Sequence, residues 1–195
     1  MRFLPLVLAC LAAPAFAADP VNIQPDVASV TVPTADGPVE ISRAQDPESK
    51  LEGDWALTSR ACPPFCIQPM APAEGVRTIG ELELLDALAD PEVVVIDSRT
   101  PPWFKGGSIP GAINMPYTGM ADQLDALGCE VDFDGWICEE VPAIALFCNG
   151  PWCGQSPTAI RRIIEAGYPA EKISYYRGGM QVWRMLGLSV THAVE

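Results

Sequence analysis

The sequence predicts an α/β domain in which helices cover both faces of a central parallel sheet. Two uninterrupted apolar runs, at residues 93–96 and 143–147, are typical of strands that are buried on both faces. Segments with apolar residues at helical spacing separate these runs from each other and from a third expected strand at residues 173–176. Because strands and helices alternate along the chain, the pattern favours parallel strands joined by right-handed crossovers.

The first two expected helices are recognised by a capping pattern and by their leucines. Thr78 followed by Glu81 matches a capping box, and it precedes leucines at helical spacing. Residues 118–127 are predicted to form the next helix, with Leu124 and Leu127 as its apolar positions.

The last two expected helices follow the second and third strands. Ser156 is suited to the N-cap of a helix that has Pro157 at its first position and ends at Gly167. A final helix is expected from about Gly179 to Leu186.

An extension at residues 18–75 is expected to precede this domain, which occupies residues 76–195. Alternating residues at 28–32, an Asp36-Gly37 turn and residues 38–42 predict a β-hairpin. The rest of the extension contains Cys62 and Cys66 among several prolines, and it is expected to be irregular.

Residues 1–17 have the pattern of a signal peptide. Arg2 is followed by a short apolar run, and Ala15-Phe16-Ala17 matches a cleavage site. We therefore expect export and a periplasmic location. The alternative is a lipoprotein anchored through Cys10.

The charge and hydropathy of the chain limit its partners. The formal net charge is −13, which argues against nucleic acid and anionic membranes as partners. No later segment approaches the roughly 20 apolar residues of a membrane-spanning helix, so we expect no membrane association after removal of the signal. The sequence indicates no cofactor and no metal site.

Six cysteines remain after residue 17, and they form three close couples along the chain. An even number of cysteines in an exported protein favours disulfides. We expect structural disulfides between Cys62 and Cys66, and between Cys129 and Cys138. The third couple, Cys148 and Cys153, lies in a loop between a strand and a helix.

Cys148 is the strongest candidate for a catalytic residue. It ends a predicted strand, and in an open α/β sheet, sites form beyond the carboxyl ends of the strands. Backbone N–H groups of the following loop and helix would stabilise a thiolate there, which is the nucleophilic form of cysteine. The alternative is that Cys148 is inert, either buried or in a disulfide. The candidate loop consists of Asn149, Gly150, Pro151, Trp152, Cys153, Gly154, Gln155 and Ser156.

Several segments in the correct order resemble the rhodanese-like domain family. The resemblance covers about residues 76–187 and implies the rhodanese fold, with Cys148 accepting a sulfane sulfur as a persulfide. It also implies a supporting, structural role for Asp97, with Arg99 beside it. The matching segments are IDSR at 96–99, GSIPGAIN at 107–114, LFC at 146–148, Ser156, EAGY at 165–168 and YRGGMQVW at 176–183.

The loop departs from the family pattern in two respects. Ser156 is eight positions after Cys148 instead of the usual six, and no Lys or Arg lies between them. The missing cation argues against anionic donors such as thiosulfate. The added cysteine resembles a small group of exported rhodanese-like proteins, and it suggests thiol–disulfide exchange between Cys148 and Cys153.

Two classes of function follow from these residues. The first is an enzyme that uses Cys148 for sulfur transfer or, together with Cys153, for thiol–disulfide exchange. Its partner would be a sulfur donor or a redox partner protein. The second is a non-catalytic module that binds a partner, with its loop cysteines joined as a structural disulfide. The state of the Cys148–Cys153 pair distinguishes them, since the enzyme needs reactive thiols.

Overall fold

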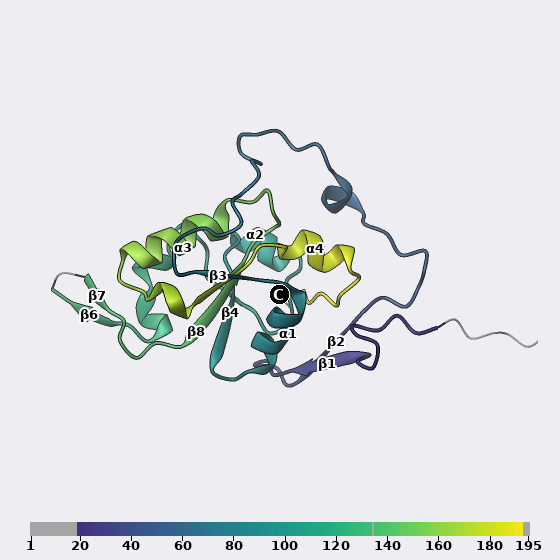
Figure 1. The fold of residues 1–195 in the computed structure, drawn as a ribbon, viewed down its shortest axis with the longest axis horizontal. Helices are drawn as coiled ribbons and strands as arrows, with labels where there is room; N and C mark the ends of the chain where they lie inside the picture. Colours follow the sequence, from purple (N-terminus) through teal and green to yellow (C-terminus); the bar gives the residue numbers. More distant parts are fainter. Residues whose placement is uncertain (1–18, 134, 193–195) are drawn as a thin grey trace, which may run out of the picture.

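The computed structural model describes residues 19–133 and 135–192, and it confirms the expected fold class (Figure 1). A central sheet has five parallel strands in the order β3-β9-β8-β4-β5. Three of them coincide with the strands expected from the sequence. The signal peptide expected at residues 1–17 lies outside the described residues. The strands are β3 (Arg77–Ile79), β4 (Val93–Asp97), β5 (Ile113–Asn114), β8 (Ala143–Phe147) and β9 (Ile173–Tyr176).

Helices cover both faces of the sheet because the strand residues alternate between two cores. Ile144 and Leu146 of β8 pack with α3, η2 and η3, whereas Ala145 and Phe147 pack with α1 and α4. Within the described ranges, no helix is both long and apolar enough to span a bilayer. The helices are α1 (Glu81–Ala89), α2 (Pro101–Lys105), α3 (Gln155–Glu165) and α4 (Gly179–Met185), with 3-10 turns η1 (Gly53–Ala56), η2 (Met120–Asp122), η3 (Leu124–Leu127) and η4 (Ala170–Lys172).

The expected capping box at Thr78 is wrong. Thr78 belongs to β3, where it pairs with Tyr175, and its hydroxyl donates to the Met70 carbonyl at 2.6 Å. The helix begins at Glu81 with Gly80 as its N-cap, and a Glu83 carboxylate oxygen accepts from the Gly80 N–H at 3.0 Å. Sheet pairing of Thr78 therefore moves the N-cap two residues along the chain, to Gly80.

The helix expected at residues 118–127 is replaced by the two short 3-10 turns η2 and η3. Gln123 separates them, with φ −133° and ψ 35°, which are not helical values. Leu124 and Leu127 are still buried, because their spacing of three residues matches the period of a 3-10 turn. The predicted apolar positions are confirmed, but the predicted type of helix is wrong.

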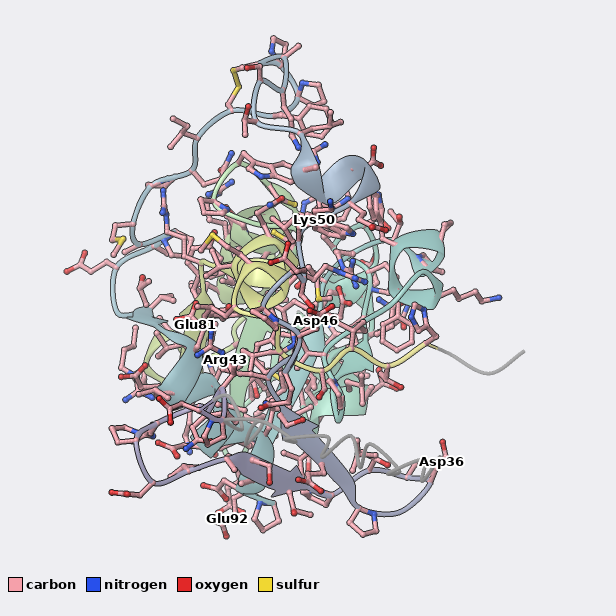
Figure 2. All side chains as sticks on the ribbon, turned by 90° about the vertical axis from the view of Figure 1, so that its right-hand side faces the viewer. Asp36, Arg43, Asp46, Lys50, Glu81 and Glu92 are labelled. Carbon is pink, nitrogen blue, oxygen red and sulfur yellow. A yellow bond between two sulfur atoms is a disulfide. The ribbon has the colours of Figure 1, made fainter. Side chains whose placement is uncertain are left out.

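The extension wraps around the domain. Its β-hairpin, β1 (Ser29–Val32) with β2 (Val39–Ser42), is the one expected, and it buries Val32 and Ile41 in the core shared with α1. Asp36 lies in the turn of this hairpin, and after β2 the chain passes Arg43, Asp46 and Lys50 (Figure 2). It arches over α2 and α4 before it enters β3 (Figure 1).

A second hairpin projects from the opposite end of the molecule (Figure 1). It consists of β6 (Glu130–Asp132) and β7 (Gly135–Ile137), and the Cys129–Cys138 disulfide closes its base. Both cysteines are buried in the core beside α3. The disulfide thus fixes an acidic segment that has few apolar contacts of its own.

Candidate functional site

Cys148 lies at the carboxyl edge of the sheet. It follows Phe147, the last residue of β8, which pairs with Asp97 at the end of β4. The thiol is 1% exposed, and as a thiol it donates to the Cys153 carbonyl at 3.3 Å. The sequence-predicted nucleophile therefore lies at the centre of the loop, beneath its second cysteine.

The start of α4 holds the first turn of the loop. The backbone N–H groups of Met180 and Gln181 donate to the carbonyls of Cys148 and Asn149 at 3.0 and 2.9 Å. Gly179 has a positive φ of 55°, and a Cβ there would collide with the Cys148 carbonyl. Glycine is required at this position because the helix and the loop backbones touch.

The surroundings of Cys148 favour its thiolate. Burial alone would raise the pKa of the thiol, but hydrogen bonds from the Cys153 thiol, from the Ser156 side chain and backbone, and from the Gly150 N–H lower the pKa of Cys148 to about 7. The pKa of Cys153 is raised by its hydrogen bond to Cys148, by burial and by the charge of Cys148. Cys148 is therefore the first of the two to ionise.

Ser156 does not cap the helix as expected. The N-cap of α3 is Gly154, whose carbonyl accepts from the Thr158 N–H at 3.0 Å. Ser156 lies inside the first turn, where its hydroxyl is buried and, while Cys148 is a thiol, has no hydrogen-bond partner among the described residues. It becomes a donor to the sulfur when Cys148 ionises, and this lowers the pKa of Cys148. The N-cap thus lies two residues before the expected one, which leaves the Ser156 hydroxyl available to the Cys148 thiolate.

Asp97 and Arg99 form a fully buried ion pair beside the loop. The Arg99 guanidinium binds both Asp97 carboxylate oxygens, with Nε at 2.9 Å from Oδ1 and Nη2 at 2.6 Å from Oδ2. The Ser108 hydroxyl also donates to Asp97, at 2.7 Å, and Arg99 Nη1 donates to the Asn149 side chain at 3.3 Å. This network connects the end of β4 to the residue that follows Cys148.

A pocket of about 360 Å³ opens over the loop. None of the side chains that line it is charged, and four of them are aromatic. Cys153 lines this pocket, whereas Cys148 lies beneath it. The lining residues are Pro64, Phe65, Trp103, Tyr117, Asn149, Trp152, Cys153, Gly154, Gln155 and Thr158.

Part of the pocket wall comes from the extension, which the sequence did not reveal. The Gln68 N–H donates to the Pro151 carbonyl at 2.8 Å, and the rings of Phe65 and Trp152 meet edge to face with centroids 5.2 Å apart. Arg60 stacks over Trp152 at 4.2 Å, but it is not among the residues that line the pocket. The one available signal was the aromatic residue between the cysteines at 62 and 66.

The structure joins Cys62 to Cys66 and Cys129 to Cys138, as expected, and leaves Cys148 and Cys153 as free thiols. Among the described residues, no three His, Cys, Asp or Glu side chains come together as a metal site.

Two curated proteins are similar to part of this chain. An HTH-type transcriptional regulator of Mycobacterium tuberculosis is 33% identical over 112 residues, which are 57% of this chain and 43% of the relative. The tRNA uridine(34) hydroxylase of Deinococcus radiodurans is 28% identical over 118 residues, which are 57% of this chain and 35% of the relative. The chain thus spans less than half the length of these curated relatives.

Two solved structures are similar to part of this chain. A rhodanese-related protein of Thermoplasma volcanium has a TM-score of 0.46 and 23% identity over 60% of this chain and 99% of its own. The rhodanese-like domain of an Anabaena protein has a TM-score of 0.43 and 21% identity, and the match covers 57% of this chain and 74% of that domain's chain. The Rhodanese-like domain family itself matches residues 81–186, more than half of the chain. This chain therefore belongs to the rhodanese-like domain family.

Proposed function

We propose that the protein is a sulfurtransferase that carries sulfur as a persulfide on Cys148. One observation carries the proposal: hydrogen bonds from the loop and from the start of α3 lower the pKa of the Cys148 thiol to about 7, despite its burial. A thiolate is the nucleophilic form of cysteine, so this position is prepared for attack on sulfur near neutral pH.

The first step is attack on the outer sulfur of a persulfide donor, R–S–S⁻. The Cys148 thiolate forms a new S–S bond, the S–S bond of the donor breaks, and the thiolate R–S⁻ leaves. The product, Cys148–S–S⁻, keeps one negative charge near the N–H groups of Gly150 and Ser156, which already stabilise the thiolate. The same groups therefore stabilise the charge before and after transfer.

The lining of the pocket supports an organic donor rather than thiosulfate. None of the side chains that line it is charged, and the nearby Arg60 stacks over Trp152 and Phe65 rather than lining the pocket, so a small anion would meet no cation among the lining side chains. A thiol or persulfide carrier with an apolar body would bury that body against Phe65, Trp103 and Trp152. We therefore expect slow turnover of thiosulfate and faster reaction with a carrier persulfide.

Cys153 provides the second step. The Cys153 thiol gives its proton to the outer sulfur of the persulfide, and its own sulfur attacks the Cys148 sulfur. The Cys148–Cys153 disulfide forms, the S–S bond of the persulfide breaks, and hydrosulfide, HS⁻, leaves. The cycle then requires an external dithiol, which reduces this disulfide and is itself oxidised. Cys153 is suited to act second because its pKa is raised while Cys148 is ionised.

The alternative is a non-catalytic module that binds a partner. It requires the two loop cysteines to be joined as a structural disulfide. Both are free thiols in the structure, and this supports the enzymatic proposal.

Single-turnover reactions with cysteine persulfide and with thiosulfate test the proposal, with released sulfide measured and the protein analysed by mass spectrometry. Cys148→Ser is expected to abolish transfer and any added mass of one sulfur. Cys153→Ser is expected to accumulate the persulfide on Cys148 and to release no sulfide without an added thiol. Full transfer by Cys148→Ser, or persulfide that forms first on Cys153, would overturn these roles.

We also propose that residues 1–17 direct export and that the partner is a periplasmic sulfur donor or thiol reductant. The motivation is the Ala15-Phe16-Ala17 motif and the pairing of four cysteines in disulfides. The intact mass of the exported protein is expected to correspond to a chain that begins at Ala18. A mass that includes Met1, or a lipid on Cys10, would contradict this assignment.

A further inference from the structure

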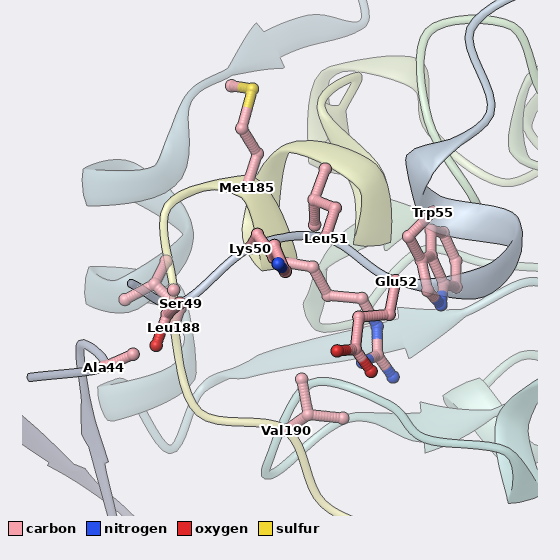
Figure 3. Close-up of a pocket in the computed structure, with 11 residues that line it drawn as sticks. Ala44, Ser49, Lys50, Leu51, Glu52, Trp55, Met185, Leu188 and Val190 are labelled. Carbon is pink, nitrogen blue, oxygen red and sulfur yellow. The ribbon is translucent and has the colours of Figure 1, made fainter. Parts of the chain in front are cut away.

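A second pocket, of about 370 Å³, lies between the extension and α4, away from Cys148 (Figure 3). This volume is within the range of roughly 300–1,000 Å³ that is typical of small-molecule sites. The extension contributes one wall through the segment around Lys50 and Trp55, and α4 with the residues after it contributes the other. None of the residues assigned above to sulfur transfer lines this pocket.

Arg184 lines this pocket together with Glu52, but the two side chains form no ion pair. Among the described residues it forms no ion pair, and its Nε is buried with no hydrogen-bond partner. Its guanidinium stacks over the Trp55 ring at 5.0 Å, and this stacking uses none of its donors. Burial, and then the nearby charge of Arg99, lower the pKa of Arg184. A partly buried guanidinium with free donors favours an anion beside it.

The other polar groups give the pocket a net charge of about +1. Lys50 adds a second cation, Glu52 adds one carboxylate, and Ser49 is neutral (Figure 3). This is notable in a chain whose formal net charge is −13. The charges therefore match a ligand that carries one negative charge.

The remaining walls are apolar. Leu51, Trp55, Met185, Leu188 and Val190 line the pocket. An inorganic anion would leave these apolar surfaces exposed to water, whereas a ligand with an apolar chain or ring would bury them. We propose that this pocket binds an amphiphilic organic monoanion, whose charged group meets Arg184 and Lys50 and whose apolar part packs against Trp55 and Leu188.

A ligand here would be coupled to the proposed active site. Trp55 contacts Trp103 edge to face, with ring centroids 5.8 Å apart, and Trp103 lines the pocket over the loop. The Trp55 carbonyl also accepts from the Gln181 side chain at 2.7 Å. Binding would hold the extension against α4, and the extension continues from there over the loop.

The test uses the full chain labelled with ¹⁵N, titrated with sodium octanoate and followed through the indole N–H resonances. The resonance that disappears in Trp55→Phe identifies Trp55. We expect a saturable shift of this resonance with octanoate, and no saturable shift with uncharged octanamide or with inorganic sulfate. Arg184→Met should weaken binding by about ten-fold or more, as expected for a lost hydrogen bond to a charged group.

Two further variants make the result decisive. Lys50→Met removes the second cation from an exposed position, so folding should be unaffected and binding should weaken by a smaller factor. Arg161→Met removes an exposed arginine of α3 and should bind octanoate like the unmodified protein. Unchanged affinity in both Arg184→Met and Lys50→Met, equal binding of octanamide, or the absence of any saturable shift would overturn the proposal. Equal binding of sulfate would point to a simple anion site and would also overturn it.

Discussion

The Arg99 guanidinium forms two parallel contacts with the Asp97 carboxylate, and both side chains are completely buried. A charged pair without access to water is stable only when its remaining donors and acceptors are satisfied. Here the Ser108 hydroxyl and the Gly107 carbonyl take part, at 2.7 and 2.8 Å. Because Arg99 also reaches Asn149, the pair is connected directly to the loop that contains Cys148.

Removal of the carboxylate should therefore be costly. Asp97→Ala would leave the Arg99 charge buried and unpaired, so we expect a loss of about 3–5 kcal/mol in the free energy of unfolding. Urea denaturation measures this loss. Asp90→Ala is the matched control, because Asp90 is exposed and accepts one local hydrogen bond from the Glu92 N–H. That change should cost less than about 1 kcal/mol, and an equally small loss for Asp97→Ala would show that the pair is not structural.

The reactivity of Cys148 should depend on pH with a midpoint near 7. Its thiolate is roughly one tenth populated at pH 6 and nine tenths at pH 8, given a pKa of about 7. Alkylation by iodoacetamide at a series of pH values, located by peptide mass spectrometry, measures this midpoint. A midpoint near the model-peptide value of 9.0 would contradict the proposed stabilisation of the thiolate.

Ser156→Ala should move this midpoint upward. The variant removes one hydrogen bond to a charged group, worth about 1.5–3 kcal/mol, which corresponds to roughly one to two pKa units. Ser98→Ala is the control, because Ser98 is also buried with an unpartnered hydroxyl but is not a neighbour that shifts the pKa of Cys148. A midpoint that moves equally in both variants would rule out a specific effect of Ser156.

The Cys129–Cys138 disulfide should contribute to global stability. The cysteines are nine residues apart and are buried beside α3, so replacing both with alanine should cost roughly 2–3 kcal/mol on the chain-entropy model. Thermal and urea unfolding of the double variant test this value. Either cysteine free in peptide maps of the native protein would reject the pairing.

The contact between Phe65 and Trp152 should limit access to the loop cysteines. Edge-to-face aromatic pairs contribute about 0.5–1.5 kcal/mol beyond their buried area, so Phe65→Ala should raise the labelling rate of Cys153 roughly two- to twelve-fold. Ile67→Ala provides the control, because Ile67 is 84% exposed and should leave the rate unchanged. Equal rates in the two variants would show that the extension does not cover the pocket.

The sequence determined the fold and the position of Cys148 because both depend on local patterns. Apolar runs that are buried on both faces predict parallel strands, and a cysteine at the end of such a strand lies at the edge where sites form. The two local disulfides could also be predicted, since each joins cysteines only a few residues apart along the chain.

The tertiary structure decided which groups act on Cys148. Pairing of Thr78 with Tyr175 overrode a favourable capping pattern, and α3 begins after Gly154, so that Ser156 lies in its first turn and lowers the pKa of Cys148 instead of capping the helix. The path of the extension was also unpredictable, because the contact between Phe65 and Trp152 joins residues far apart in the chain and follows no local period. Local patterns determine elements, but long-range packing determines the chemical environment of a side chain.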